Sequence, residues 1–259
     1  MSDNVLTSFL GNFDQYPFCV KIGQDEYKIG EGKPEFVVNF KKQVSMHSLI
    51  TSTSLALGEA YMNGDLEVEG DLYHALNHFL GQMGKFSTDE KALKKLIFTP
   101  MSKKNQQKEV QSHYDIGNDF YKLWLDDSMS YSCGYFQNES DTLKQAQAGK
   151  VDYILRKLNL KKDMYLLDIG CGWGLGDMRF YTVGVESLRR HYNRTLLCWN
   201  ENFQKHRREV VEMFDERFAR MWELFLCSCA ATFMNGIIDL HQIIFTSDVN
   251  NELPMTKWY

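Results

Sequence analysis

The sequence predicts a chain of the α+β / α/β class, in which a small N-terminal α/β domain precedes a nucleotide-binding domain with a shortened sheet. Residues 18–40 alternate apolar and polar side chains as strands do, and residues 54–80 have helical spacing. An apolar run at residues 164–169 leads directly into a glycine-rich loop, as expected of a parallel strand buried on both faces. Only residues 175–178 separate that loop from the next strand-like run, whereas a crossover between parallel strands takes about 10–12 residues or more.

The small domain is expected to cover residues 1–100. Residues 18–29 have the pattern of a β-hairpin with its turn at residues 23–25, and residues 36–40 have that of a further strand. Residues 54–63 and 72–80 are predicted to be helices. The stretch between these helices is rich in glycine and aspartate, which favour turns.

A basic segment follows the small domain. Residues 91–108 contain six lysines and no acidic residue, and we expect a linker at residues 101–110 before the second domain at residues 111–259. One interpretation is a solvated linker. The other is a contact with an anionic membrane surface, to which each nearby lysine contributes about 1 kcal/mol.

The second domain has a helical pattern on both sides of the glycine loop. Residues 119–125 and 141–160 are predicted to be helices. Apolar residues at three- to four-residue spacing predict one long helix over residues 209–234, and residues 239–245 are expected to form a short strand or a helix end.

Composition excludes several functional classes. The chain has 259 residues with 29 Lys and Arg against 34 Asp and Glu, and a net charge of −5 argues against a nucleic-acid partner. The six cysteines form no CxxC pair and no His lies near enough to suggest zinc, so we expect no metal site. No signal peptide is evident, and the longest apolar stretch is shorter than the ~20 residues of a membrane span. We therefore expect a reduced, cytoplasmic protein.

The glycine-rich loop is the first feature that suggests chemistry. Asp168, Gly170, Gly172 and Gly174 end the apolar run with GxGxG spacing, which differs from the GxGxxG of dinucleotide sites. Glycines let a ligand approach backbone N–H groups closely. A carboxylate just before the loop suits the amino-acid end of S-adenosylmethionine better than a pyrophosphate. The alternative is an ordinary tight turn.

The stretches around the loop closely resemble cyclopropane-fatty-acyl-phospholipid synthases. They comprise residues 57–65 (LGEAYMNGD), 110–121 (VQSHYDIGNDFY), 129–136 (MSYSCGYF), 166–174 (LLDIGCGWG), 191–196 (HYNRTL) with Trp199, 216–218 (ERF) and 229–233 (CAATF). The resemblance extends over nearly all of the chain. It implies a class I (Rossmann-like) methyltransferase domain, here truncated, behind the small N-terminal domain.

The resemblance also implies a reaction and its partners. S-adenosylmethionine methylates the cis double bond of an unsaturated phospholipid acyl chain, and a bound bicarbonate then removes a proton from the new methyl so that the three-membered ring closes. The partner is phospholipid at the membrane surface, which implies peripheral membrane association.

Site residues follow from the same resemblance. The positions that match cofactor contacts are Tyr131, Ser132, Asp168, Gly170, Cys171, Gly172, Trp173 and Gly174. Cys133 and Tyr192 match residues around the bicarbonate, and Cys229 matches a cysteine assigned to the family's active site. Alternatively, Cys133 and Cys229 are small buried apolar residues, as lone reduced cysteines often are, and Tyr192 is a packing tyrosine.

The sequence departs from the family directly after Gly174. Residues 179–188 resemble the strand that precedes the family's terminal helices, so roughly 120–130 residues are absent when judged by usual family length. The absent part would hold most of the parallel sheet, the acid that binds the ribose, and the Glu and His that complete the bicarbonate pocket. Glu186 ends a strand-like run but follows the loop too closely to be the ribose acid.

These observations leave three functional hypotheses open. The first is a cyclopropane synthase whose shortened chain has doubtful turnover and shows weak or no binding of S-adenosylmethionine. The second is a non-catalytic, lipid-associated remnant that pairs with an intact copy, and a homodimer is possible. The third is a small-molecule methyltransferase.

The shortened sheet also predicts self-association. We expect exposed Phe214, Phe218, Trp222 and Phe225 to promote it, unless that stripe packs on the helix at residues 141–160.

Overall fold

The computed structural model describes residues 2–45, 48–49, 53–82, 116–160, 181–246, 250–251, 253–254 and 256–259. The predicted strand at residues 164–169, the glycine loop and the basic linker lie outside the described residues, as does most of the motif at residues 110–121. The described parts combine helices and strands, which confirms the α+β class.

A four-stranded sheet forms the centre of the N-terminal unit, with strand order β2-β1-β3-β4. Strands β1 (Phe18–Ile22) and β2 (Asp25–Ile29) form the predicted hairpin, and β3 (Val37–Phe40) confirms the next predicted strand and pairs with β1 in parallel. Strand β4 (Leu66–Glu69) was not predicted. Its alternation spans only two apolar positions between two turn-forming Gly-Asp pairs, which is too short to stand out from a loop.

Three helices cover this sheet. They are α1 (Ser2–Leu10), which was not predicted, and α3 (Thr53–Met62) and α4 (Leu72–Gly81), which were. Asp71 caps α4 because its carboxylate accepts a hydrogen bond of 2.8 Å from the N–H of His74. Fully buried aromatic side chains fill the space between helices and sheet, and the rings of Phe18 and Phe36 stack at 5.1 Å.

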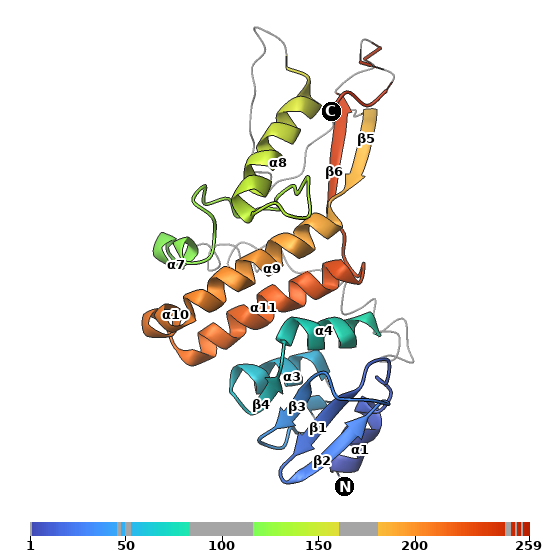
Figure 1. Cartoon of the computed structure of the whole chain (residues 1–259), viewed down its shortest axis with the longest axis vertical. Helices are drawn as coiled ribbons and strands as arrows, with labels where there is room; N and C mark the ends of the chain where they lie inside the picture. Colours follow the sequence, from blue (N-terminus) through green and yellow to red (C-terminus); the bar gives the residue numbers. More distant parts are fainter. Residues whose placement is uncertain are drawn as a thin grey trace.

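Helices α9 (Arg189–Lys205) and α11 (Glu216–Met234) run side by side across the middle of the molecule, and α4 lies against α11 (Figure 1). The predicted single helix over residues 209–234 is wrong, because α10 (Arg207–Met213) ends before α11 begins. Asp215 causes the break: its extended backbone and its carboxylate, which accepts from the N–H of Phe218 at 2.6 Å, cap a new helix.

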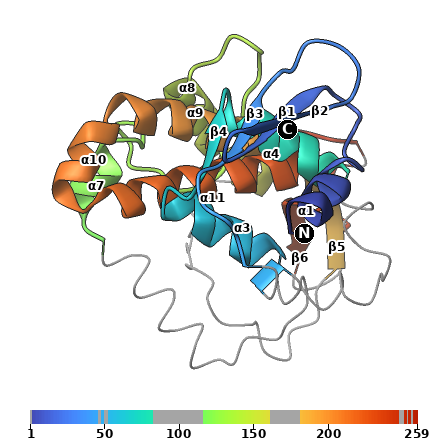
Figure 2. The same cartoon turned by 90° about the horizontal axis from the view of Figure 1, so that it is seen from below.

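The aromatic stripe of α11 has a different cover from the expected one. It packs on Phe120 of α7 (Asn118–Lys122), with ring centroids 4.9 Å from Trp222 and 5.4 Å from Phe218, and not on the helix at residues 141–160. Both views place α7 beside α10 (Figures 1 and 2). Trp222 is buried, and only Phe214 and Phe225 of the stripe are exposed. The predicted long exposed stripe is therefore wrong.

A second, smaller layer lies on the far side of α9. Helix α8 (Leu143–Leu158) confirms the predicted helix and begins at a capping box of Thr142 and Gln145. Strands β5 (Tyr181–Ser187) and β6 (His241–Thr246) form an antiparallel ribbon beside it (Figure 1). Lys157 of α8 forms an ion pair with Glu186 of β5, which joins the two elements. Within the described ranges, no helix is long and apolar enough to cross a membrane.

Candidate functional site

The segment at residues 130–136 lies between α8 and α9, and backbone hydrogen bonds hold it on both sides. On the α8 side, the Gln147 amide donates to the carbonyl of Ser132 at 2.9 Å, and the Tyr135 N–H donates to the carbonyl of Ala146 at 2.9 Å. Gln147 is almost fully buried. Its amide therefore fixes this segment from inside the protein.

On the α9 side, two side chains accept hydrogen bonds from backbone N–H groups of the same segment. Thr195 Oγ1 accepts from the N–H of Gly134 and His191 Nδ1 accepts from that of Phe136, both at 3.0 Å. Burial lowers the pKa of His191. Since its Nδ1 accepts a hydrogen bond, the imidazole is held in the neutral form.

Cys133 and Tyr192 meet at one backbone carbonyl. The Cys133 thiol lies 3.9 Å from the oxygen of Leu188, and the N–H of Tyr192 donates to the same oxygen at 2.9 Å. Burial raises the pKa of Cys133 to about 12. The thiol is therefore protonated at neutral pH and is a weak donor here, whereas a nucleophile would need the thiolate.

Tyr192 and Cys229 belong to the same packed cluster between α9 and α11. The Tyr192 ring lies 4.8 Å from that of Phe233, which is one helical turn beyond Cys229 on α11. Burial raises the pKa of Cys229 to about 11, so this thiol is protonated as well. The structure thus places all three expected catalytic residues around one helix pair.

Two of the expected cofactor residues, Tyr131 and Ser132, lie in the described part of the chain. The centroid of the Tyr131 ring lies 5.4 Å from that of Trp124 and 5.3 Å from that of Trp199. The Trp199 ring also packs against the Tyr192 ring, with centroids 6.1 Å apart. Ser132 is exposed, and its hydroxyl accepts from Lys150 Nζ at 2.8 Å. The remaining expected cofactor residues lie outside the described residues, namely Asp168, Gly170, Cys171, Gly172, Trp173 and Gly174.

Sequence reasoning assigned no role to Thr195 or Asn193, which the structure makes central. Asn193 donates to the carbonyl of Ala230 at 2.8 Å and to the Tyr73 hydroxyl at 3.1 Å, so it joins α9, α11 and α4. Both residues are buried polar side chains on α9. Their place within the HYNRTL motif was the available signal, because a polar residue on the buried face of a helix needs a partner.

The Cys133 thiol and the Tyr192 side chain carry no negative charge that would repel an anion. Both thiols are uncharged, so neither would repel an anion, and Cys133 Sγ–H and the Tyr192 hydroxyl are donor groups. Glu186, the acidic residue closest to Leu188 in the sequence, is bound by Lys157 and by the Tyr153 hydroxyl at 2.9 Å. It is thereby engaged in holding α8 to the ribbon.

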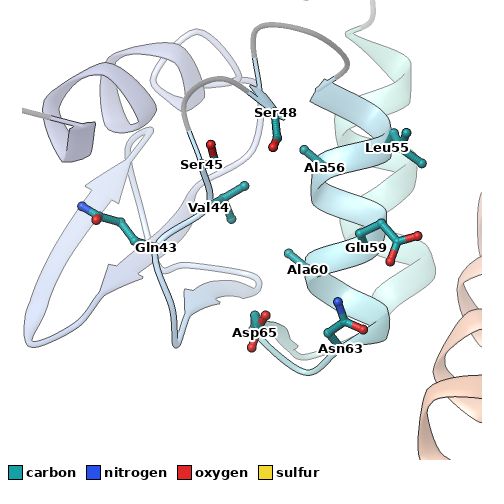
Figure 3. Close-up of a pocket in the computed structure, with 10 residues that line it drawn as sticks. All are labelled: Gln43, Val44, Ser45, Ser48, Leu55, Ala56, Glu59, Ala60, Asn63 and Asp65. Atoms are coloured by element: carbon teal, nitrogen blue, oxygen red, sulfur yellow. The ribbon is translucent and has the colours of Figure 1, made fainter.

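A cavity of about 440 Å³ lies elsewhere, in the N-terminal unit between α3 and the segment after β3. Ala56 and Ala60 form its helix wall, Val44 and Ser45 lie opposite, and Asp65 closes one end (Figure 3). None of the sequence-predicted site residues lines it. The thiol and phenol groups therefore form a region separate from this cavity.

Comparison with known families gives two matches. The model described as mycolic acid cyclopropane synthetase matches two segments, residues 101–179 and 175–243, which overlap directly after the glycine loop. A model described as a domain of unknown function matches residues 5–91.

Individual relatives agree with the family match. A protein of Pseudomonas putida described as a probable fatty acid methyltransferase is 25% identical over 364 residues, which cover 86% of this chain and 91% of the relative. Cyclopropane mycolic acid synthase 1 of Mycobacterium tuberculosis is 41% identical over 122 residues, 43% of this chain and 42% of the relative. This chain therefore spans less than half of that synthase. A solved cyclopropane synthase from Mycobacterium tuberculosis is 21% identical, with a TM-score of 0.48 over 53% of this chain and 97% of its own.

Proposed function

Because this chain belongs to the mycolic acid cyclopropane synthetase family, whose members are S-adenosylmethionine-dependent methyltransferases, we propose that its site serves methylene transfer to the cis double bond of an unsaturated phospholipid acyl chain. The observation that carries this proposal is the meeting of Cys133 and Tyr192 at the carbonyl of Leu188. It brings the Cys133 thiol of one motif to the first turn of α9, the helix that carries Tyr192 of the other motif.

In this proposal, the Cys133 and Tyr192 side chains hold a bicarbonate ion, which supplies the base of the reaction when bound. Burial keeps the Cys133 thiol protonated, so the thiol can donate to the anion and does not compete as a nucleophile. Thr195 and His191 position this thiol by fixing the N–H groups of Gly134 and Phe136, which follow it in the chain. The buried aromatic side chains of Trp199 and Phe233 pack against the Tyr192 ring and limit the access of water to it.

The cofactor side would be formed by Tyr131, Ser132 and the loop at residues 168–174, which supplies backbone N–H donors to S-adenosylmethionine. Packing against Trp124 and Trp199 fixes the Tyr131 ring. Lys150 approaches the Ser132 hydroxyl and could meet a carboxylate there, although burial lowers the pKa of Lys150.

We further propose that an internal segment of the family domain is missing from this chain. Two findings support this. The two family matches overlap at residues 175–179, and the alignment with the Pseudomonas putida relative spans 364 residues although this chain has only 259. No residue then matches the ribose-binding acid or the Glu and His of the bicarbonate pocket. We therefore expect turnover far below that of a full-length member, since a general base must be held within hydrogen-bond reach of its proton.

The test restores the missing part. The chain and a chimera carrying the corresponding Pseudomonas putida segment at residues 175–178 are incubated with methyl-labelled S-adenosylmethionine, bicarbonate and dioleoyl phospholipid vesicles. We expect label in the lipid with the chimera, little with the chain itself, and a large loss on Cys133→Ala or Tyr192→Phe in the chimera. A folded chimera that leaves the lipid unlabelled contradicts the proposed function.

The lack of a match for the pocket's Glu and His favours a second candidate function, a non-catalytic and membrane-associated remnant. Its basic segment at residues 91–108 would bind anionic lipid, and the binding would weaken with salt. A chain that labels no lipid but sediments with anionic vesicles at low salt supports this candidate. Failure of the chain to sediment with anionic vesicles at low salt argues against this candidate.

A further inference from the structure

The β5–β6 ribbon has one covered face and one open face. On the covered face, Glu186 and Gln242 receive hydrogen bonds from Lys157 of α8. Because side chains alternate along a strand, the neighbouring positions point to the opposite face. Helix α8 therefore covers only one side of the ribbon, as Figure 1 also shows.

The open face is apolar. Val185 of β5 and Ile243 and Phe245 of β6 lie on it, with exposed fractions of 44–58%, and Val185 is directly opposite Ile243 in the register. None of these three side chains is charged. Burying them against another apolar surface would therefore leave no charge without a partner.

The outer edge of β5 has no partner strand among the described residues. In the part of the chain that the structure describes, β5 pairs with β6 alone. Natural edge strands usually carry Lys, Pro or inward-facing charges that prevent pairing. Strand β5 has neither Lys nor Pro, and its single charged residue, Glu186, is bound to Lys157. A bulge beside Val183 is the one protective feature of this edge.

These features together identify the kind of partner. A lipid surface would cover the apolar side chains but cannot satisfy the N–H and C=O groups of the strand edge. A partner that supplies a strand satisfies both. A second copy of this chain brings an identical uncharged strand edge with an identical apolar face, and a two-fold axis makes such a surface complementary to itself.

We propose that β5 is the dimer interface of this protein, where the β5 strands of two copies pair antiparallel and join two ribbons into one four-stranded sheet. The interface would comprise three apolar side chains and one strand edge from each copy, which is a small contact surface. This is less than the ~800 Å² per partner of a standard interface. We therefore expect a reversible, concentration-dependent dimer.

The test measures the mass of the purified full chain by sedimentation equilibrium over a wide concentration range. We expect a monomer of 30.2 kDa that converts to twice that mass as concentration rises. Val185→Lys places a charge on the open face and should raise the dimer dissociation constant roughly tenfold or more. Val151→Lys on α8 is the matched control, because Val151 is similarly exposed (51%) but lies away from β5, and it should leave dimerisation unchanged.

Hydrogen exchange distinguishes pairing between two β5 strands from cover of the same edge by lipid or by another part of this chain. The N–H groups of residues 181–187 should exchange more slowly in the dimer than in the monomer. Three results would each overturn the proposal: a wild-type chain that stays monomeric, equal dissociation by both lysine variants, or equal protection of residues 181–187 in monomer and dimer. Equal protection in monomer and dimer would mean that another part of the same chain covers the β5 edge. Protection that appears only with phospholipid vesicles would assign the face to membrane and would overturn it as well.

Discussion

The guanidinium of Arg220 on α11 lies 4.3 Å above the Tyr61 ring and donates a 2.5 Å hydrogen bond to the Tyr61 carbonyl on α3. It also donates to the carbonyl of Leu66 at 2.9 Å. This buried contact joins the N-terminal unit to the helix that carries Cys229. The two units therefore share a polar contact as well as apolar packing.

Arg220→Met should destabilise the protein by roughly 2–4 kcal/mol, because two buried carbonyl groups and the Glu67 carboxylate would lose the guanidinium donor. Urea unfolding followed by circular dichroism measures the loss. Arg217→Ala is the control, since the Arg217–Glu59 ion pair is about half exposed and should contribute less than about 1 kcal/mol. Equal losses in the two variants would contradict the importance of the buried contact.

Lys157→Met should also destabilise the protein, by roughly 1–3 kcal/mol, because the Glu186 carboxylate loses its cation while Lys157 itself is buried. Combining Lys157→Met with Glu186→Gln should restore part of the loss, since the unpaired charge is then removed. Thermal unfolding of the two single variants and the double variant gives the coupling. Additive losses would mean that the pair does not hold α8 to the ribbon.

Stability should fall as the pH is lowered below the ordinary histidine pKa of 6.5, because burial lowers the pKa of His191 in the folded chain. The unfolded chain then binds a proton that the folded chain resists, and the balance shifts toward unfolding. Unfolding midpoints at about pH 7.5 and about pH 5.5 measure the effect. His191→Gln keeps an acceptor for the Phe136 N–H and should show a smaller decline. An unchanged decline of stability in His191→Gln would show that other titratable groups cause it.

Cys133 should resist alkylation by iodoacetamide at neutral pH in the folded protein, because its thiol is buried and its pKa is raised to about 12. Mass spectrometry of peptides after timed labelling measures the rate. In urea, all six cysteines should react at similar rates. Fast labelling of native Cys133 would show that the thiol is accessible and ionised, which the packing between α8 and α9 argues against.

Periodicity in the sequence was sufficient for elements that bury one regular face. The hairpin at residues 18–29 and helices α3, α4 and α8 follow their patterns because each has enough residues to show a period of two or 3.6. Strand β4 has too few residues to show one. The apolar spacing of residues 209–234 continues through Phe214, but the carboxylate of Asp215 caps a new helix and so divides this stretch into α10 and α11.

The sequence by itself contained the family motifs, and with them the prediction of which thiol, phenol and glycine positions serve the reaction. Only the tertiary structure decided that the Cys133 thiol reaches the carbonyl of Leu188 at the start of α9, and that α7 covers the aromatic stripe of α11. The physical reason is that local periodicity reports which face of an element is apolar. Which distant element covers that face depends on how the helices pack, and no single segment contains that information.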